Sequence, residues 1–304
     1  MAHVFVVGGT GFIGPHLIRA FLEKGYQVTA LIRSEKKASR LPKGVHQIFG
    51  DPLRPGPWQR ELKEAEVIVN LAGANIFARW TPKYKRLIFE SRLFTTQNII
   101  EALPGQGEGK VLLQASAVGY YGADRGEEEV TEEAPAGRDF LAQVCKAWEE
   151  AALAGQRYGL RVCLMRIGVV LGQDGGALAK MLLAFKLGLG GPVGSGRQWF
   201  PWIHIKDMVR AALFLAENKA AFGPFNFTAP GIVRNRDLAK TLGQALKRPA
   251  FLPAPALVLR VLFGEMAQVL LGGVKALPRR LTEVGYQFLF PDLVLALKDL
   301  CQRA

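Results

Sequence analysis

The chain contains few of the residues that build disulfide frameworks and metal sites. Its 304 residues include three cysteines and four histidines. Cys145, Cys163 and Cys301 show no C-x-x-C spacing, and the histidines show no paired spacing of metal ligands. The sequence therefore argues against a disulfide framework and a metal site, and predicts reduced thiols in a cytoplasmic protein.

The chain also has no long uninterrupted apolar run. The longest apolar stretch, 257–274, contains Arg260 and Glu265, which predicts a buried or amphipathic helix and not a membrane span. No charged segment followed by an apolar one precedes the first predicted strand, so no signal peptide is expected. The net charge of +13 is scattered without a basic run, which disfavours nucleic-acid binding; a positive field also attracts phosphorylated cofactors.

What the chain does have is a glycine-rich turn near its start. The apolar run 4–7 is typical of a buried parallel strand, and it leads directly into glycines and a helical pattern over about 13–24. This order favours the phosphate-binding turn of a dinucleotide-binding fold over an ordinary glycine-rich loop, because glycines let a pyrophosphate approach the helix N-terminus. The candidate cofactor-binding residues of the turn are Gly8, Thr10, Gly11, Phe12, Ile13 and Gly14.

The second predicted strand, 27–32, indicates which dinucleotide is bound. An acidic residue at its end would hold the 2′-hydroxyl of NAD. Arg33 and Ser34 stand there instead, with further basic residues close behind. A guanidinium suits a 2′-phosphate by charge and by its forked donors, so the sequence predicts NADP; the alternative is a solvated basic loop.

Strands and helices then alternate along the chain. Further strands are predicted at 45–49, 67–72, 111–116 and 161–166, and helices at 82–102 and 139–158. This alternation predicts the α/β class, with a Rossmann-type doubly wound parallel sheet and a smaller C-terminal substrate-side domain. We expect residues 1–171 to form the NADP-binding domain, rejoined by about 203–228. The substrate-side region comprises 172–202 and 229–304.

The motifs resemble the extended short-chain dehydrogenase/reductase superfamily, which includes NAD-dependent epimerase/dehydratase-like and nucleotide-sugar epimerases. A narrower resemblance, to the "epimerase family" proteins with their own C-terminal domain, covers nearly the whole chain. The motifs that carry the two resemblances are the turn 8–14, Asn70 to Gly73, Ser91-Arg92, Ser116 to Gly122, Trp148-Glu149, 166–172, 198–204, Asn226-Phe227 and the tail 278–288.

The resemblance implies a Tyr-x-x-x-Lys pair on one helix, with a Ser or Thr on the preceding strand. In such a pair the ammonium lowers the pKa of the phenol, which then takes a substrate proton while hydride moves to the nicotinamide. Lys146 is the matching lysine, but Ala142 stands four residues earlier and Ala117 occupies the Ser/Thr position. The usual catalytic Tyr is therefore missing.

Three other residues are candidates to replace the missing catalytic Tyr and the Ser or Thr. Tyr120, Tyr121 and Ser116 follow or end the fifth strand, where the fold places its ligand crevice. The alternative is that Tyr121 packs beside the cofactor and that Tyr120 fills the core or a loop. Lys146 is expected to bind the nicotinamide ribose or to be an ordinary exposed lysine.

By the same resemblance, further residues are expected along the cofactor. Asp51 could accept from the adenine amino group or form a turn with Pro52. The middle of the cofactor is expected to lie along Leu71, Ala72 and Gly73.

The substrate-side candidates carry cations and aromatic faces. Arg92 could meet a phosphate or substrate acid, or pair with Glu90 or Glu101. Arg197, Gln198 and Trp199 suit a planar base or sugar ring, the alternative being tryptophans that seal the interdomain core. His204 is expected to be structural, and Asp207 to cap a helix over 208–217.

Two functions from different classes follow. The first is an NADP-dependent oxidoreductase or epimerase acting on a hydroxyl of a nucleotide-sugar-like or other small polar substrate. The second is a non-catalytic NADP-binding sensor or regulatory protein. A homodimer is expected only by analogy with the superfamily.

Overall fold

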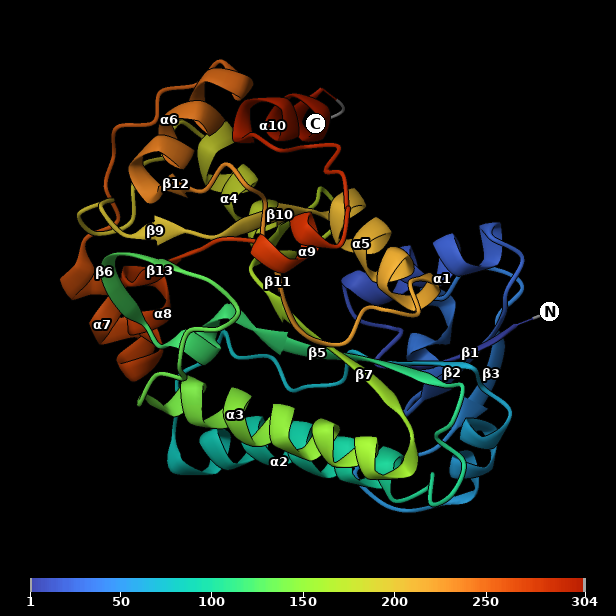
Figure 1. Ribbon diagram of the computed structural model, residues 1–304. Helices are drawn as coiled ribbons and strands as arrows, with labels where there is room; N and C mark the ends of the chain where they lie inside the picture. Colours follow the sequence, from blue (N-terminus) through green and yellow to red (C-terminus); the bar gives the residue numbers. More distant parts are fainter. Residues whose placement is uncertain (1, 303–304) are drawn as a thin grey trace.

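A seven-stranded parallel sheet forms the centre of the protein (Figure 1), which a computed structural model describes over residues 2–302. The strand order is β11-β7-β5-β4-β1-β2-β3, so the order reverses beside β1. In such sheets the ligand crevice lies at the carboxyl ends of the strands where the order reverses. The strands are β1 (His3–Val7), β2 (Gln27–Ile32), β3 (His46–Phe49), β4 (Val67–Asn70), β5 (Val111–Ala117), β7 (Arg161–Ile167) and β11 (Gly223–Phe227).

Helices cover both faces of this sheet, which confirms the doubly wound α/β prediction. On one face lie α1 (Ile13–Glu23) and α5 (Ile205–Glu217); on the other lie α2 (Pro82–Ile100) and α3 (Phe140–Leu153) (Figure 1). In β1, Val4 and Val6 belong to the core on the α1 side, whereas Phe5 and Val7 belong to the core on the α2 side. Because alternate side chains enter opposite cores, the strand must be apolar throughout.

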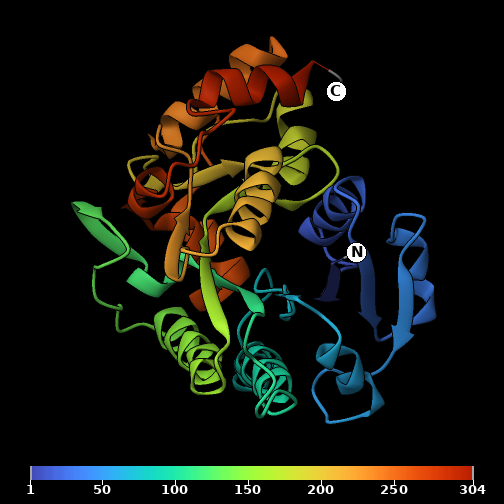
Figure 2. The ribbon, with the colours of Figure 1, turned by 45° about the vertical axis from the view of Figure 1, so that its right-hand side comes forward.

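A second layer is formed by segments that lie before and after β11, the last strand of the sheet in sequence. It contains α4 (Gly176–Lys186), α6 (Asn235–Leu246) and α10 (Leu293–Cys301), which share a separate apolar core; Figure 2 shows the orange and red helices gathered above the sheet. Between these elements the chain returns to the sheet through α5 and β11, within 203–228. The remaining elements are β6 (Asp124–Val130), β8 (Val169–Leu171), β9 (Trp199–Phe200), β10 (Trp202–His204), β12 (Val233–Arg234), α7 (Ala256–Phe263), α8 (Ala267–Leu271), β13 (Gly273–Ala276) and α9 (Arg279–Glu283).

The start of α5 differs from the prediction. The N-cap is His204, whose Nδ1 accepts a hydrogen bond from the Lys206 amide at 3.0 Å. Asp207 lies inside the first turn, fully buried, and accepts from the Tyr286 hydroxyl and from the amides of Leu289 and Phe290. The expectation that Asp207 caps the helix is therefore wrong, because its carboxylate is occupied by the segment that leads into α10.

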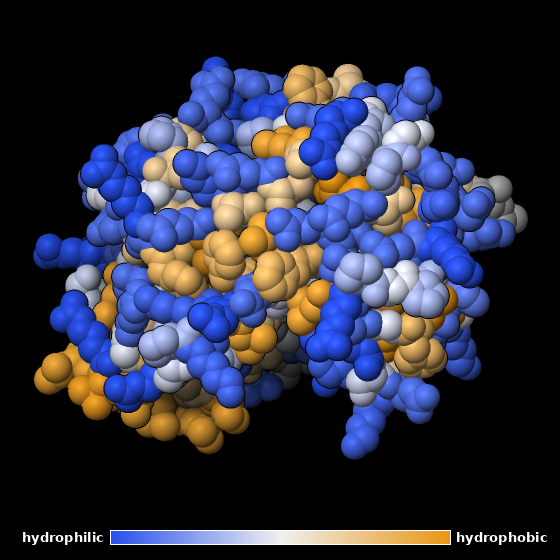
Figure 3. All heavy atoms as spheres, turned by 90° about the horizontal axis from the view of Figure 1, so that it is seen from below, coloured by the Kyte–Doolittle hydropathy of each residue, from blue (hydrophilic) through white to orange (hydrophobic). Residues whose placement is uncertain are grey.

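The surface is mostly hydrophilic in the view of Figure 3, with apolar side chains gathered at its lower left, on the side where Figure 1 places α7. On α7, Leu257, Val258, Val261 and Leu262 are exposed. Among the helices of residues 2–302, none is both long and apolar enough to cross a membrane. The stretch 257–274 is accordingly divided between α7, α8 and β13.

Candidate functional site

The glycine turn after β1 is packed against the end of β4 and the start of α1. Gly8 has a φ of +84°, and a Cβ there would lie 2.7 Å from the Leu71 carbonyl carbon and the Ala72 nitrogen. A Cβ on Gly14 would lie 2.2 Å from the Gly9 oxygen. Gly11 instead borders open space, with the Gly8 oxygen alone within 4 Å of its Cβ position. Gly8 and Gly14 thus permit close packing, and Gly11 leaves room for a ligand.

The start of α1 offers unpaired backbone donors to that space. The helix begins at Ile13 after Phe12, without a side-chain cap and without an acidic residue in its first turn. Its first amides and the positive end of its dipole therefore suit a phosphate group. The Phe12 ring packs against Gly172, Gly175 and Gly176, which anchors this turn to the chain after β8.

The ends of β2 and β3 lie side by side, because Ile32 of β2 is in register with Phe49 of β3. Arg33 and Ser34 follow β2, and Asp51 follows β3. Arg33 is exposed and forms no ion pair within residues 2–302, so its guanidinium is available to a ligand. Asp51 is exposed too, and its Oδ1 accepts from the Leu53 amide at 3.1 Å. This is the turn-forming role that the sequence left open for Asp51.

The end of β4 is held by a buried amide. Asn70 donates to Thr96 and Gln114, both at 3.0 Å, and its Oδ1 accepts from the Ala72 amide at 3.1 Å. These bonds fix the turn in which Leu71 and Gly73 face the pocket, whereas Ala72 is not part of the pocket wall.

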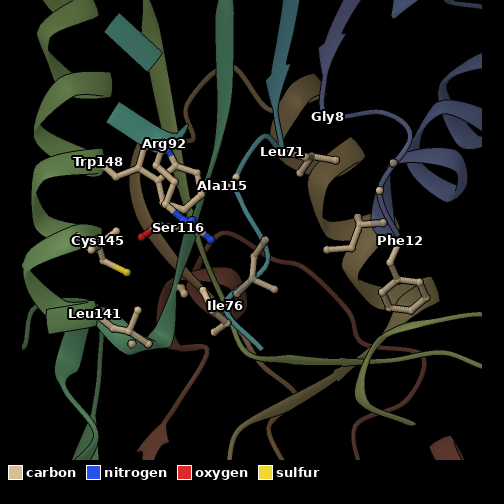
Figure 4. Close-up of a pocket in the computed structure, with 18 residues that line it drawn as sticks. Gly8, Phe12, Leu71, Ile76, Arg92, Ala115, Ser116, Leu141, Cys145 and Trp148 are labelled. Atoms are coloured by element: carbon tan, nitrogen blue, oxygen red, sulfur yellow. The ribbon is translucent and has the colours of Figure 1, made fainter. Parts of the chain in front are cut away.

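One pocket of about 330 Å³ joins the glycine turn to the space between α2 and α3 (Figure 4). Its phosphate-side wall contains Gly8, Gly11, Phe12, Ile13, Gly14, Leu71 and Gly73. Thr10, in the same turn, is not in the wall. Its opposite wall contains Ile76, Arg92, Ser116, Leu141, Val144, Cys145, Trp148 and Ile167. A cofactor held by the glycine turn would therefore extend toward these side chains.

The residues of α3 that line the pocket differ by one position from the Ala142 and Lys146 pair expected from the sequence. Leu141 and Cys145, four positions apart, face the pocket together with Val144 and Trp148. Ala142 is buried outside the pocket wall. Lys146 points away from the pocket; its side chain is 61% exposed and lies 3.9 Å from Glu150. The pair with Tyr-x-x-x-Lys spacing at the pocket is thus Leu141 and Cys145, and the structure does not bring Lys146 to a cofactor ribose.

Ser116 lines the pocket, but its hydroxyl is committed elsewhere. Its Oγ donates to Glu149 Oε1 at 2.6 Å, and the same carboxylate holds Arg166 through two hydrogen bonds of 2.9 and 2.8 Å. The Glu149–Arg166 pair is buried, and despite the cost of burial the Glu149 contacts keep the pKa of Arg166 above its ordinary value. This network packs behind the pocket, and it engages the proton of the Ser116 hydroxyl.

Neither tyrosine after β5 lies in the pocket wall. Tyr121 is buried; it donates to Asn226 Oδ1 at 2.6 Å and accepts from Arg166 at 3.0 Å. Burial raises the pKa of Tyr121 to about 12, with Arg166 opposing the shift. The Tyr120 ring lies against the Arg166 guanidinium, 3.6 Å from ring centroid to Cζ. Tyr120 therefore has a packing role, as the alternative for it expected, whereas Tyr121 is held by Asn226 and Arg166 outside the pocket wall.

The candidates around β9 also lie outside the pocket wall. Arg197 is exposed, and Gln198 Nε2 donates to the carbonyls of Val193 and Leu270, both at 3.0 Å. The Trp199 indole donates to Gly126 and is covered by Arg234, 3.6 Å from its ring centroid. These contacts hold β9 against its neighbours, and substrate contact by Arg197, Gln198 and Trp199 stays a prediction.

Arg92, by contrast, lies in the pocket with no carboxylate partner. Its Nη1 donates to the Ile88 carbonyl at 3.0 Å, and its guanidinium lies 5.0 Å from the Trp148 ring centroid. Within residues 2–302 no carboxylate lies within 4.0 Å, and Glu90 is paired with Arg86 instead. Burial lowers the pKa of Arg92. The pairing with Glu90 or Glu101 that the sequence left open is not formed.

The sheet, its glycine turn and the pocket at the strand ends together define a dinucleotide-binding α/β protein of the short-chain dehydrogenase/reductase type. The model of the "NAD dependent epimerase/dehydratase family" matches residues 4–227, and the chain belongs to this family. A second model, "Domain of unknown function (DUF1731)", matches residues 254–300. The resemblance stated from the sequence motifs is therefore confirmed, including the separate C-terminal domain.

Named relatives match nearly the whole chain. The "Epimerase family protein SDR39U1 homolog, chloroplastic" of Arabidopsis thaliana is 40% identical, covering 98% of this chain and 86% of the relative. "Epimerase family protein SSP1921" of Staphylococcus saprophyticus is 39% identical and covers 99% of both chains. The crystal structure of human epimerase family protein SDR39U1 with NADPH is 36% identical, covers 99% and 100% of the two chains, and superposes with a TM-score of 0.87.

Proposed function

We propose that the protein is an NADP(H)-dependent oxidoreductase acting on a small molecule. The supporting observation is that one pocket connects the glycine turn with a second wall formed by residues of α2, α3, β5 and β7. A nicotinamide group in this pocket would supply or accept a hydride. The residues of the glycine turn and the α1 N-terminus would hold its diphosphate, and the far wall would hold the substrate.

NADP(H) is preferred to NAD(H) because of the residues after β2. Arg33 and Ser34 stand where an NAD-binding chain would present an acid, and Arg33 has no acidic partner within residues 2–302. The human relative described above was crystallised with NADPH, which agrees with this preference.

The chain's own residues limit the proton chemistry. Leu141 cannot exchange a proton, and burial raises the pKa of the Cys145 thiol to about 12, so it stays protonated. No side chain in the pocket wall therefore replaces the phenol that removes a hydroxyl proton. We infer that any proton in the reaction is exchanged with water. A sugar epimerisation, which needs such a base, is the less favoured activity.

The lack of a proton-accepting side chain in the pocket wall also supports a second candidate, a non-catalytic protein whose bound NADP(H) reports redox state. Deuterium at C4 of NADPH distinguishes the two. Stereospecific loss of deuterium in the presence of candidate substrates supports an oxidoreductase. Retention with every substrate, while NADPH binds normally, supports the sensor.

Calorimetric titration with NADPH and with NADH tests the cofactor assignment. We expect a clear NADPH preference, and Arg33→Ala should weaken NADPH binding by about tenfold or more while leaving NADH binding nearly unchanged, because the guanidinium contacts the 2′-phosphate alone. Arg40→Ala removes a charge from the same basic segment and is the matched control. Equal losses for the two cofactors in Arg33→Ala would contradict the 2′-phosphate role.

A further inference from the structure

We propose that the α2–α3 side of the pocket binds a small carboxylate with an apolar body, and that Arg92 pairs with its carboxylate. This rests on the proposed function, since it names the substrate class of that site. It departs from the nucleotide-sugar expectation that the sequence resemblance raised. The observations behind it are one half-buried cation without an acidic partner within residues 2–302 and a wall that is mostly apolar.

Arg92 is held in place but left unneutralised. A guanidinium has five N–H donors, and within residues 2–302 one of them has a protein acceptor, the Ile88 carbonyl. The Trp148 ring lies on one side of the guanidinium, and Gly73 approaches so closely on another that a Cβ there would lie 2.9 Å from Cζ. Because the guanidinium is half-buried, it has lost part of its hydration, and an anion that fills the remaining donors would compensate that loss.

The position of Arg92 favours a substrate anion over the cofactor's phosphates. Figure 4 shows Arg92 beside Trp148 on the α3 side of the cavity, with Gly8 and Phe12 across the cavity beyond Leu71. The glycine turn and the α1 N-terminus already supply donors for a diphosphate on that other side. The guanidinium is therefore free to bind a second anion, and one isolated cation matches the single charge of a carboxylate better than a phosphate dianion.

The rest of the wall suits an apolar body. Ile76, Leu141, Val144 and Trp148 line it, and the two polar side chains nearby contribute little, since Ser116 donates to Glu149 and the Cys145 thiol remains protonated. A sugar ring would leave several hydroxyls without partners here, whereas apolar carbon atoms gain from burial.

Calorimetry on the NADPH-saturated protein tests this with matched probes. Phenylacetate, 3-phenylpropionate, cyclohexylacetate and 4-methylpentanoate are each compared with the corresponding neutral amide, and UDP-glucose is titrated separately. We expect at least one carboxylate to bind about tenfold or more tightly than its amide and more tightly than UDP-glucose. Equal binding of acid and amide in all four pairs overturns the proposal, as does tighter binding of UDP-glucose.

Three variants on α2 distinguish a substrate carboxylate from the cofactor as the anion that Arg92 binds. Arg92→Met should reduce the affinity for the carboxylate to that of its amide while changing NADPH affinity less than twofold, and Arg92→Lys should restore part of the difference. Arg86→Met, an exposed change on the same helix, should alter neither affinity. A tenfold loss of NADPH binding in Arg92→Met would assign the guanidinium to the cofactor and overturn the proposal. Failure of the wild-type protein to bind NADPH would instead refute the proposed function.

Discussion

His204 is a completely buried histidine whose environment disfavours its charged form. Its ring stacks on Phe290 with centroids 3.9 Å apart, and its Nε2 lies 3.2 Å from the Asp299 carboxylate. Burial lowers the pKa of His204 to about 4, although Asp299 opposes the shift and Lys206 adds to it. The folded protein therefore holds this ring neutral at pH values where an unfolded chain would protonate it.

This difference makes stability depend on pH. Between about pH 6.5 and about pH 4 the unfolded chain binds a proton at His204 that the folded protein does not, so the free energy of unfolding should fall as pH falls, by up to about 3 kcal/mol. Urea unfolding at several pH values measures this. His204→Asn keeps a side-chain acceptor at the N-cap without a titrating group, and its stability should depend less on pH. Identical slopes would rule out His204 as the source.

The pocket face of α3 could not be predicted from the sequence at single-residue precision. Both candidate pairs, Ala142 with Lys146 and Leu141 with Cys145, have the required spacing of four, and the lysine made the first pair the natural choice. Which pair faces the pocket depends on how α3 is rotated against β5 and α2. That rotation follows from tertiary packing, including the buried ion pair between Glu149 of α3 and Arg166 of β7. The cofactor half, by contrast, was predictable because its glycines act locally.

At the scale of elements, the turn after β1 depends on Gly8 for two reasons, its positive φ and its contact with the β4 turn. Gly8→Ala should lower the free energy of unfolding by about 3 kcal/mol, since it combines backbone strain with a backbone clash. Gly25 has nearly the same φ, +83°, with nothing within 4 Å of its Cβ position. Gly25→Ala should therefore cost about 1 kcal/mol from strain alone. Chemical denaturation of both variants gives the comparison, and equal costs would mean that the clash is relieved.

The sheet strands with apolar runs were predictable from the sequence, whereas β6, α4, α6 and the short strands were not. The six strands expected in the sheet all form, because a strand buried on both faces needs an apolar run that the sequence displays. β8, β9, β10 and β12 have two or three residues each, and partners distant in sequence define them. Trp199 lies in β9, one of these short strands, and Gln198 directly precedes it. Their polar atoms satisfy backbone groups of other segments, which composition alone does not reveal.

At the scale of the whole molecule, Asp207 connects α5 of the sheet layer to the segment preceding α10. Asp207→Ala would leave two amides without an acceptor and the Tyr286 hydroxyl with the carbonyl of residue 207 alone, 3.2 Å away, so we expect a loss of about 3 kcal/mol in the free energy of unfolding. Tyr286→Phe removes one of these bonds and should cost about 1 kcal/mol. Urea unfolding measures both. If Asp207→Ala is no more destabilised than Tyr286→Phe, the two amide contacts contribute nothing.

The second layer has a further consequence for how the protein is made. Its apolar core contains Leu178 and Leu182 of α4, Leu238 of α6, and Leu293 and Leu297 of α10. A ribosome delivers these segments in that order, and the sheet is already complete at β11, long before α10 is synthesised. Throughout that interval the core that α4 and α6 help to form lacks the α10 side chains that complete it. A nascent chain stalled between β11 and α10 would thus present a folded sheet together with an open hydrophobic surface, the kind of surface that chaperones bind.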